Sequence, residues 1–192
     1  KKTFSILAVA LIASLFAKQA NAQNVQLMYD TERAQWTSTV EMFRPDSFGS
    51  TYFFVDLDYN PTVVGAYWEI SRELCFWKDT KLSWLSAHIE YNGGIYCLNN
   101  WLAGATYSGH SADYSKTWSL TASYKAIPGL KDAEGNCRMH TFQITGVWGI
   151  RFAKGWCDFS GFFDFWRENQ VSVFISEPQF WVNLNKIKGW EN

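Results

Sequence analysis

Polar and apolar residues alternate along most of the chain that follows residue 22. Between residues 50 and 60 the odd positions carry mainly apolar side chains, and Asp56 and Asp58 stand between them. Between residues 138 and 152 the even positions Phe142, Ile144 and Trp148 are apolar. An alternation with a period of two residues predicts a β-strand that has one apolar and one polar face.

Ten such segments can be drawn, and short clusters of turn residues join most of them. They run over about 24–31, 36–45, 50–60, 63–77, 81–92, 95–107, 114–127, 138–152, 156–168 and 173–186. The turns are expected at residues 45–49, 60–61, 78–80, 92–94 and 153–155, and a longer polar connection at 128–137. Consecutive strands with tight connections predict an all-β, antiparallel up-and-down meander.

The length of the strands and the position of the rings indicate which all-β architecture this is. Most segments are longer than the usual strand of about 5–6 residues, and a strand that crosses a bilayer needs about 9–11. Aromatic residues such as Tyr29, Trp36, Tyr107 and Trp148 collect near the segment ends. Rings at both membrane interfaces and a polar inner face are typical of outer-membrane barrels. The pattern therefore predicts a transmembrane β-barrel.

The first 22 residues form a separate segment that predicts export. Lys1 and Lys2 precede the apolar run 4–16, and Ala20-Asn21-Ala22 follows it. A basic start, an apolar stretch of about a dozen residues and an A-x-A site are typical of a secretory signal peptide. We expect cleavage after Ala22 and one barrel domain over residues 23–192, located in the outer membrane of a Gram-negative bacterium.

Composition and charge narrow the function further. The chain holds 15 Phe, 11 Trp and 9 Tyr, only 18% of its residues are charged, and its formal net charge is −1. A disordered chain would be richer in charge and poorer in rings, and a nucleic-acid-binding protein would show an excess of basic residues. We expect outer-membrane lipid as the surroundings, a monomer, and no nucleic-acid partner.

Histidine and cysteine give no metal or catalytic motif, and we expect no cofactor. His88, His110 and His140 are scattered. Ser86 and His88 share a strand, where a step of two residues spans about 6–7 Å, too far for the hydrogen bond of a nucleophile–base pair. The four cysteines lack a C-x-x-C spacing, and the strand map predicts buried free thiols. We therefore do not expect an enzyme.

The last residues, 188–192, resemble a turn rather than a closing strand. An open sheet edge in lipid leaves backbone groups unpaired, at a cost of several kcal/mol each. Either ten strands close the barrel or a further hairpin is missing, and we favour the second, with twelve strands in the full-length protein.

The block TVEMFRPDSFGSTYFFVDLDY, residues 39–59, and the following AYWEISRELCFW carry a family resemblance. They resemble an outer-membrane protein family of Bacteroides-type bacteria that is similar to the Tsx-type nucleoside-specific channels. The resemblance covers about residues 23–188 and implies a monomeric twelve-stranded barrel. No individual nucleoside-contacting residue can be matched onto this chain.

If the apolar positions face lipid, the interleaved positions face the lumen. That face is acidic and contains rings, and ring stacking on a base contributes roughly 1–3 kcal/mol. We predict a channel for the passive uptake of small, nucleoside-like solutes. The candidate solute-binding residues are Phe54, Asp56, Asp58, Glu69, Glu73, His88, Glu90, Arg151, Asp158, Phe162, Asp164, Trp166, Glu177 and Trp181.

Two other hypotheses stay open from the sequence. The first is a non-conducting structural or adhesion barrel whose lumen is filled by its own side chains. The second is a soluble periplasmic β-barrel or β-sandwich that binds a ligand.

Overall fold

One continuous antiparallel sheet contains every strand of residues 23–189. The computed structural model describes residues 23–189, so the predicted signal peptide lies outside the described residues. Ten strands follow one another in the sheet in their order along the chain, and each pairs antiparallel with the next. The strands are β1 (Gln23–Asp30), β2 (Gln35–Asp46), β3 (Gly49–Tyr59), β4 (Val63–Leu74), β5 (Leu85–Gly94), β6 (Asn100–His110), β7 (Lys116–Ala126), β8 (His140–Phe152), β9 (Cys157–Glu168) and β10 (Val171–Val182). The predicted all-β up-and-down architecture is confirmed.

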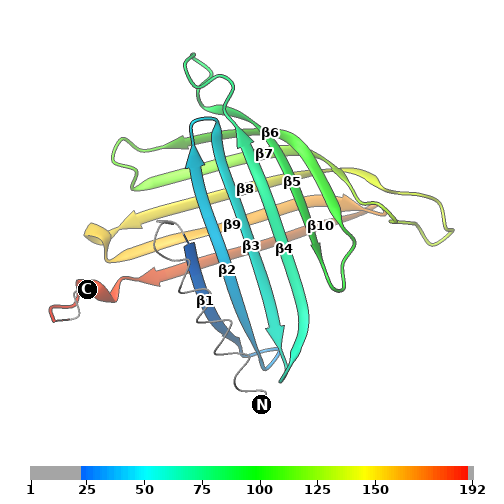
Figure 1. Ribbon diagram of the computed structural model, residues 1–192, viewed down its shortest axis with the longest axis horizontal. Helices are drawn as coiled ribbons and strands as arrows, with labels where there is room; N and C mark the ends of the chain where they lie inside the picture. The colour runs from blue at the N-terminus through cyan, green and yellow to red at the C-terminus, as the bar shows by residue number, and fades with distance from the viewer. Residues whose placement is uncertain (1–22, 190–192) are drawn as a thin grey trace.

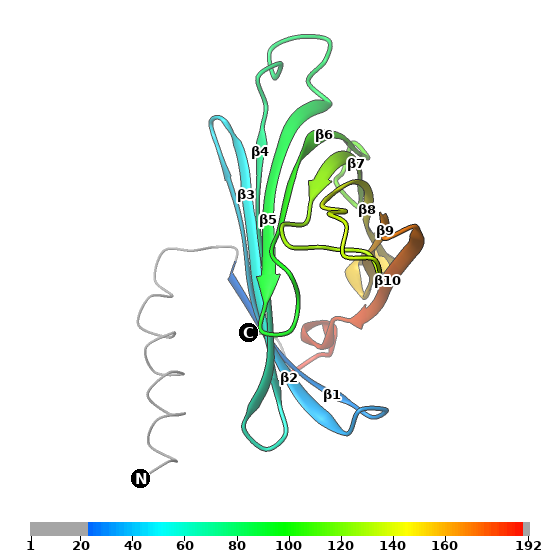
Figure 2. The same cartoon turned by 90° about the vertical axis from the view of Figure 1, so that its right-hand side faces the viewer.

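The sheet curls into a half-barrel. Figure 1 shows β1–β4 crossing in front of β7–β10, and Figure 2, turned by 90°, shows the curved profile of the sheet. Sheets have an inherent right-handed twist, and tilted strands allow a sheet to wrap toward a barrel. β1 and β10 are the two edge strands. The concave face is therefore enclosed on one side and open between these edges.

Two sets of turns define the two ends of the half-barrel. Rim A contains the β2–β3, β4–β5, β6–β7 and β8–β9 connections, together with a short 3-10 helix, η2 (Leu184–Lys186). Rim B contains the other five connections, including the long one between β7 and β8. In Figure 1 rim A lies at the top and left, and rim B at the bottom and right.

The polarity of the two faces is the reverse of that of a water-soluble protein. Among the described residues the buried hydrophobic side chains are Leu102, Ile127 and Leu130. The buried polar or charged side chains are Thr39, Ser86, His88, Glu90, Asn92, Thr106, Thr121, Ser123, Lys125 and Gln143. The convex face instead exposes large hydrophobic residues such as Ile70, Ile89 and Leu120. The apolar set of each strand points outward, and the polar set points into the curve.

Most strands lie where the alternation predicts them, but two turns do not lie at their predicted positions. The expected turn at Asn92-Gly93-Gly94 is wrong, because these residues continue β5 and pair with β4. A Cβ atom at Gly93 would lie 2.6 Å from Asn99 Oδ1 and 3.3 Å from the indole of Trp68, so the glycine leaves room for both side chains. The expected strand 63–77 ends at Leu74, since a series of tight turns occupies residues 75–84. The apolar residues at the start of these turns continue the strand-like pattern of the sequence, although the strand has already ended.

Trp84 shares the parity of the inner residues of β5 but does not belong to the inner face. It lies in the β4–β5 loop, its indole nitrogen donates to the Lys81 carbonyl at 2.9 Å, and its ring contacts Tyr107. Arg72, which interrupts the apolar set of β4, occupies an unbroken register opposite Thr51. Its guanidinium forms a bidentate pair with Asp46 at 2.7 and 2.9 Å. The strand pairing therefore has no bulge at Arg72.

All four cysteines are free thiols in the described residues, as the strand map predicts. The expectation that they are buried is wrong for Cys97 and Cys137, which are exposed in the connections at rim B. No helix among residues 23–189 is long and apolar enough to cross a membrane.

Gly104 is a point where the pairing of β6 with β7 depends on the absence of a side chain. A Cβ atom at Gly104 would lie 2.0 Å from the backbone oxygen of Ala122. We expect Gly104→Ala to lower the free energy of unfolding by about 1–3 kcal/mol, because overpacking forces the backbone to move. Chemical unfolding in detergent measures this. The matched control is Gly65→Ala, whose Cβ would meet only the Asp58 side chain at 3.2 Å, and equal losses in both variants would contradict the assignment.

Candidate functional site

The strand register places all the predicted site residues on one face of the sheet. His88 pairs with Glu73, Phe54 with Glu41 and Glu69, Arg151 with Asp158, and Phe162 with Glu177. Because side chains alternate between faces, these pairs fix the remaining positions as well. The predicted residues are Phe54, Asp56, Asp58, Glu69, Glu73, His88, Glu90, Arg151, Asp158, Phe162, Asp164, Trp166, Glu177 and Trp181, and all of them belong to the concave face.

Half of the concave face is filled by hydrogen-bonded side chains. The Glu73 carboxylate accepts from His88 Nδ1 at 2.6 Å, from Thr106 Oγ1 at 2.9 Å and from the hydroxyl of Ser86. His88 Nε2 lies 3.2 Å from the Glu90 carboxylate, and the Asn92 amide donates to Glu90 at 3.0 Å. Most buried polar groups in proteins are hydrogen-bonded in this way. These residues therefore hold the wall of β4–β6 together.

The network continues across β7, β8 and β9 through a buried cation. Lys125 Nζ donates to the Gln143 side-chain oxygen at 2.7 Å, and Gln143 Nε2 donates to Asp164 at 2.9 Å. The same ammonium lies 4.3 Å from the ring centroid of Trp166, an attractive cation–π geometry. One face of the Trp166 ring is thus occupied by a residue of the protein itself.

Along β2 and β3 the inner carboxylates bond to neighbouring hydroxyls. Asp56 accepts from Thr39 at 2.5 Å and Asp58 accepts from Thr37 at 2.6 Å. Tyr52 donates to Glu41 at 3.0 Å. Nearby, the ring of Phe54 lies 6.0 Å from that of Tyr52 and 5.9 Å from that of Tyr67, measured between centroids. The inner side chains of β3 and β4 are half-buried, and so they are less enclosed than inner side chains such as His88 and Lys125 in β5–β8.

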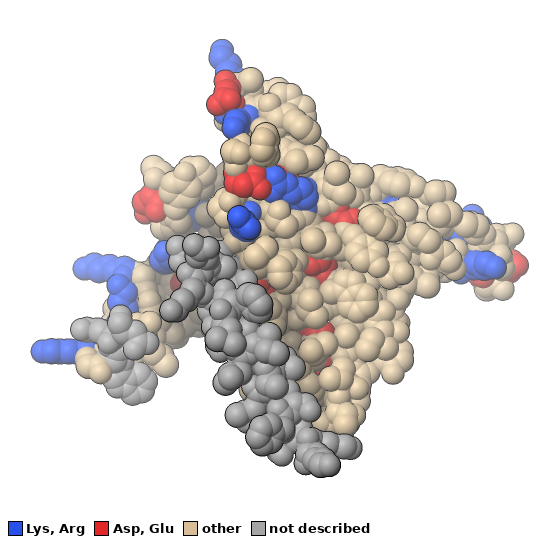
Figure 3. All heavy atoms as spheres, in the orientation of Figure 1, with Lys and Arg blue, Asp and Glu red and all other residues tan. Residues whose placement is uncertain are grey.

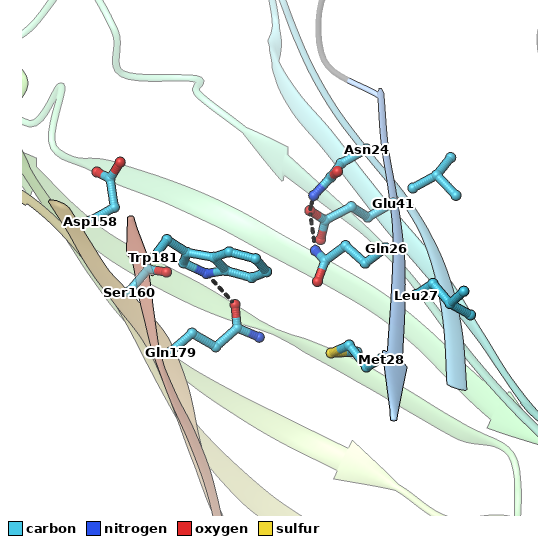
Figure 4. A pocket seen from close by; sticks show the side chains of 10 residues that line it. Asn24, Gln26, Leu27, Met28, Glu41, Asp158, Ser160, Gln179 and Trp181 are labelled. Atoms are coloured by element: carbon cyan, nitrogen blue, oxygen red, sulfur yellow. Dashed lines mark hydrogen bonds between the residues drawn. The ribbon is translucent and has the colours of Figure 1, made fainter. Parts of the chain in front are cut away.

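An open cavity lies between the two edge strands. It has a volume of about 510 Å³ and is lined from one side by β1 and Glu41, and from the other by β9 and β10. Figure 4 shows Trp181 and Gln179 extending from β10 toward Asn24, Gln26 and Glu41 on the opposite wall. We call this space the seam cavity; its lining residues are Asn24, Val25, Gln26, Leu27, Met28, Glu41, Asp158, Ser160, Gln179 and Trp181.

The polar groups of the seam cavity are held by pairs on each wall. Asn24 Nδ2 and Gln26 Nε2 both donate to Glu41 Oε1, at 2.8 and 3.2 Å. Across the cavity, the indole of Trp181 donates to Gln179 Oε1 at 2.9 Å. Amides, a carboxylate and a half-exposed indole therefore face the same space. Such a surface can exchange hydrogen bonds with hydroxyl or amine groups and can stack against a flat ring.

The seam cavity contains only two of the predicted site residues, Asp158 and Trp181. Five of the others, Glu69, Glu73, His88, Glu90 and Asp164, bond to neighbouring side chains in the filled half. Asn24, Gln26, Glu41, Ser160 and Gln179 belong to the cavity but were not among the predicted residues. The alternation put four of these five on the inner face, yet no sequence signal indicates which stretch of that face stays open.

The long β7–β8 connection stands at rim B and is internally ordered. Asp132 accepts from the backbone and side-chain amides of Asn136 at 2.7 and 3.1 Å, and from Arg138 at 2.9 Å. Desolvation raises the pKa of the Asp132 carboxyl, but these donors lower it more, and the pKa lies below its usual value. The connection also reaches the β9–β10 turn, where Asn169 donates to the Lys131 carbonyl at 2.9 Å. These contacts keep the connection at one mouth of the concave face.

The described residues contain no group of three or more His, Cys, Asp or Glu arranged to hold a metal ion. Ser86 and His88 both bond to Glu73, so within residues 23–189 the serine donates to the carboxylate and not to the imidazole. This geometry lacks the nucleophile–base contact of hydrolytic sites.

The family model of a domain of unknown function, DUF5020, matches residues 22–192. The chain belongs to the DUF5020 family. The match covers the whole ten-stranded sheet of this DUF5020 domain. Searches of curated proteins and of solved structures gave no match.

Glu73 should be the most sensitive carboxylate of the concave face. In Glu73→Ala, Ser86, His88 and Thr106 lose a shared acceptor in an enclosed region, and we expect the free energy of unfolding to fall by about 2–4 kcal/mol. Chemical unfolding in detergent measures the loss. The matched control is Glu177→Ala, because Glu177 is exposed and bonds only to Gln179 among the described side chains. A loss in the control as large as in Glu73→Ala would contradict the role of the network.

Proposed function

We propose that this domain is an outer-membrane β-barrel that forms a passive channel for small, nucleoside-like solutes. The observation that carries the proposal is the inverted polarity, with hydrophobic side chains on the convex face and polar side chains inside the curve. Exposing apolar surface to water costs about 25 cal/mol per Å². That cost disappears when the convex face contacts hydrocarbon, while the polar face retains water or hydrogen-bonded partners.

The aromatic residues of the convex face support a membrane location. Near rim A, Tyr107 contacts Trp84 and Trp118 with ring centroids 4.8 Å apart in both pairs. Near rim B, Tyr29 contacts Trp36 at 5.1 Å, and Tyr91 contacts Trp101 at 4.6 Å. Aliphatic residues such as Ile89 and Leu120 lie between these two levels. Rings of this kind favour the two interfaces of a bilayer.

The edges of the sheet set a condition that a membrane barrel must meet. The outer backbone groups of β1 and β10 have no neighbouring strand in residues 23–189. In hydrocarbon each unpaired group costs several kcal/mol. The proposal therefore requires that the two edges pair, either with each other or with further strands that enlarge the barrel to the twelve expected from the family resemblance.

The seam cavity supports the proposed class of solute. Glu41 and Asp158 line it, and the nearby Glu177 adds a third carboxylate. Arg151 lies at the rim and contacts Asp158 at 3.3 Å. A wall with this excess of acid disfavours anions. The amides and the Trp181 indole suit a neutral solute that carries hydroxyl groups and a flat ring, as nucleosides do.

One observation favours a second candidate, a barrel that does not conduct. The side chains of β5–β8 fill their half of the concave face with a buried network, as the lumen of a small barrel is filled. If the edges closed directly on one another, the same filling would extend across the seam. Conduction therefore depends on whether the space between β1 and β10 stays open.

Solute flux tests the channel directly. The full-length protein is reconstituted into liposomes, and insertion is checked by heat-dependent mobility on a denaturing gel. We expect saturable uptake of nucleosides and a loss of roughly twofold or more in Ser160→Trp, because a bulky ring then enters the passage. Ser172→Trp is the matched control, since it adds the same ring to the exposed convex side of β10. Inserted protein without flux would leave the non-conducting barrel as the better account.

Charge selectivity tests the role of the acidic wall. We expect the reversal potential in a salt gradient to indicate preference for cations. The double variant Glu41→Gln, Asp158→Asn should lower the cation-to-anion permeability ratio roughly twofold or more, because two carboxylates of the passage lose their charge. Glu32→Gln combined with Glu134→Gln removes the same charge from exposed turns of rim B. An equal change in that control would contradict a selective role for the seam.

A further inference from the structure

The two rims carry different charge. The basic residues of rim A outnumber its acidic ones, while rim B carries both signs in similar number. The cations of rim A are Arg44, Arg72, Lys78, Lys81, Lys116, Arg151, Lys154, Lys186 and Lys188, and its acids are Asp46, Glu73, Asp79, Asp113 and Asp158. At rim B the cations are Arg33, Lys125, Lys131, Arg138 and Arg167, and the acids are Asp30, Glu32, Asp58, Asp132, Glu134 and Glu168. Figure 3 shows Lys and Arg gathered at the top and left, where rim A lies.

Cations from two separate parts of the chain meet at the β8–β9 turn of rim A. Taking the position that a Cβ atom would have at Gly155, Lys186 Nζ lies 3.8 Å away and Arg151 Cδ lies 3.9 Å away. Lys154 immediately precedes this glycine in the β8–β9 turn, the 3-10 helix η1 (Ala153–Gly155). We call Arg151, Lys154 and Lys186 the rim A cluster.

Hydrogen bonds attach η2, which carries Lys186, to the β8–β9 turn. The backbone amide of Asn183 donates to the Trp156 carbonyl at 2.9 Å, and its side-chain amide lies 3.5 Å from the Gly155 carbonyl. The Asn183 side chain also accepts from the backbone amide of Asn185 at 3.1 Å. These contacts hold Lys186 beside the turn.

The cluster has an excess of positive charge. Arg151, whose side chain is largely exposed, contacts the half-buried Asp158 at 3.3 Å. Within residues 23–189, Lys154 and Lys186 form no ion pair. Like charges held close together repel one another, and a bound anion relieves that repulsion. The cluster therefore favours an anionic partner that can contact more than one of these cations.

The aromatic residues next to the cluster indicate where that anion comes from. Phe152 and Phe180 lie on the convex face with ring centroids 6.1 Å apart, and Trp156 follows the turn directly. All three are exposed. In the proposed membrane orientation these rings lie at the level of the lipid head groups, which places the cations beside lipid phosphates.

We propose that the rim A cluster binds the phosphate groups of anionic membrane lipids and orients the barrel in the bilayer. The inference rests on the proposed membrane location, and it adds a specific lipid contact to it. Basic residues at a membrane surface attract anionic head groups within about a Debye length. Rim B, with its mixed charge, lacks that attraction.

Quenching of tryptophan fluorescence by brominated lipid tests the proposal. The protein is reconstituted into phosphatidylcholine vesicles that contain brominated phosphatidylglycerol or brominated phosphatidylcholine, and the two quenching curves give a relative binding constant. We expect a preference for phosphatidylglycerol that falls about fivefold or more in Lys154→Gln, Lys186→Gln, because each basic residue contributes separately. Added sodium chloride should weaken the preference of the unaltered protein.

The matched control is Lys131→Gln combined with Arg167→Gln, which removes the same charge at rim B and should leave the preference unchanged. The proposal is overturned if the rim A variant keeps its preference, if the control loses as much, or if inorganic phosphate removes the preference at an ionic strength where chloride does not. Protein that inserts without any preference overturns only this inference. Protein that enters no vesicle overturns the proposed function and this inference with it.

Discussion

The structure depends on one constraint, the uninterrupted antiparallel pairing of ten consecutive strands. Because each strand pairs with its neighbour in sequence, and side chains alternate along every strand, a residue's parity decides which face it occupies. The single irregularity in the β3–β4 register lies at the end of the pair, between Asp58 and Tyr59. The apolar sets of the strands therefore join into one convex surface, and the polar sets join into one concave surface.

The concave surface is divided by curvature. Where the sheet curls around β5–β8, opposing side chains come close enough to satisfy one another, and residues such as His88 and Lys125 are buried without a hydrophobic core. Toward the edges, β1 and β10 lie apart and a cavity remains. The acidic side chains of the concave face therefore fall into two groups with different roles. Those in the tight curve stabilise the wall, and those at the seam are available to a solute in the proposed channel.

The two ends of the half-barrel differ because the connections differ. The connections of rim A and the attached helix η2 concentrate basic residues, whereas rim B has the long β7–β8 connection with its own internal hydrogen bonds. In the proposed membrane orientation this asymmetry gives the two surfaces of the bilayer different partners. A barrel with one basic rim and one mixed rim would have a preferred direction in an anionic membrane.

The sequence by itself determined the strands and the faces, since periodicity is a local property: Phe142 and Gln143 could be assigned to opposite faces without knowing what lies across the sheet. It misplaced the ends of β4 and β5, because turn residues such as Gly93 can also serve a close approach to Trp68. Only the tertiary structure decided which inner residues are enclosed and which remain open. His88 and Asp158 occupy the same face and both are polar, but the curl of the sheet buries His88 in a network and leaves Asp158 at the seam. Curvature arises from the summed twist and tilt of ten strands, and no single segment encodes it.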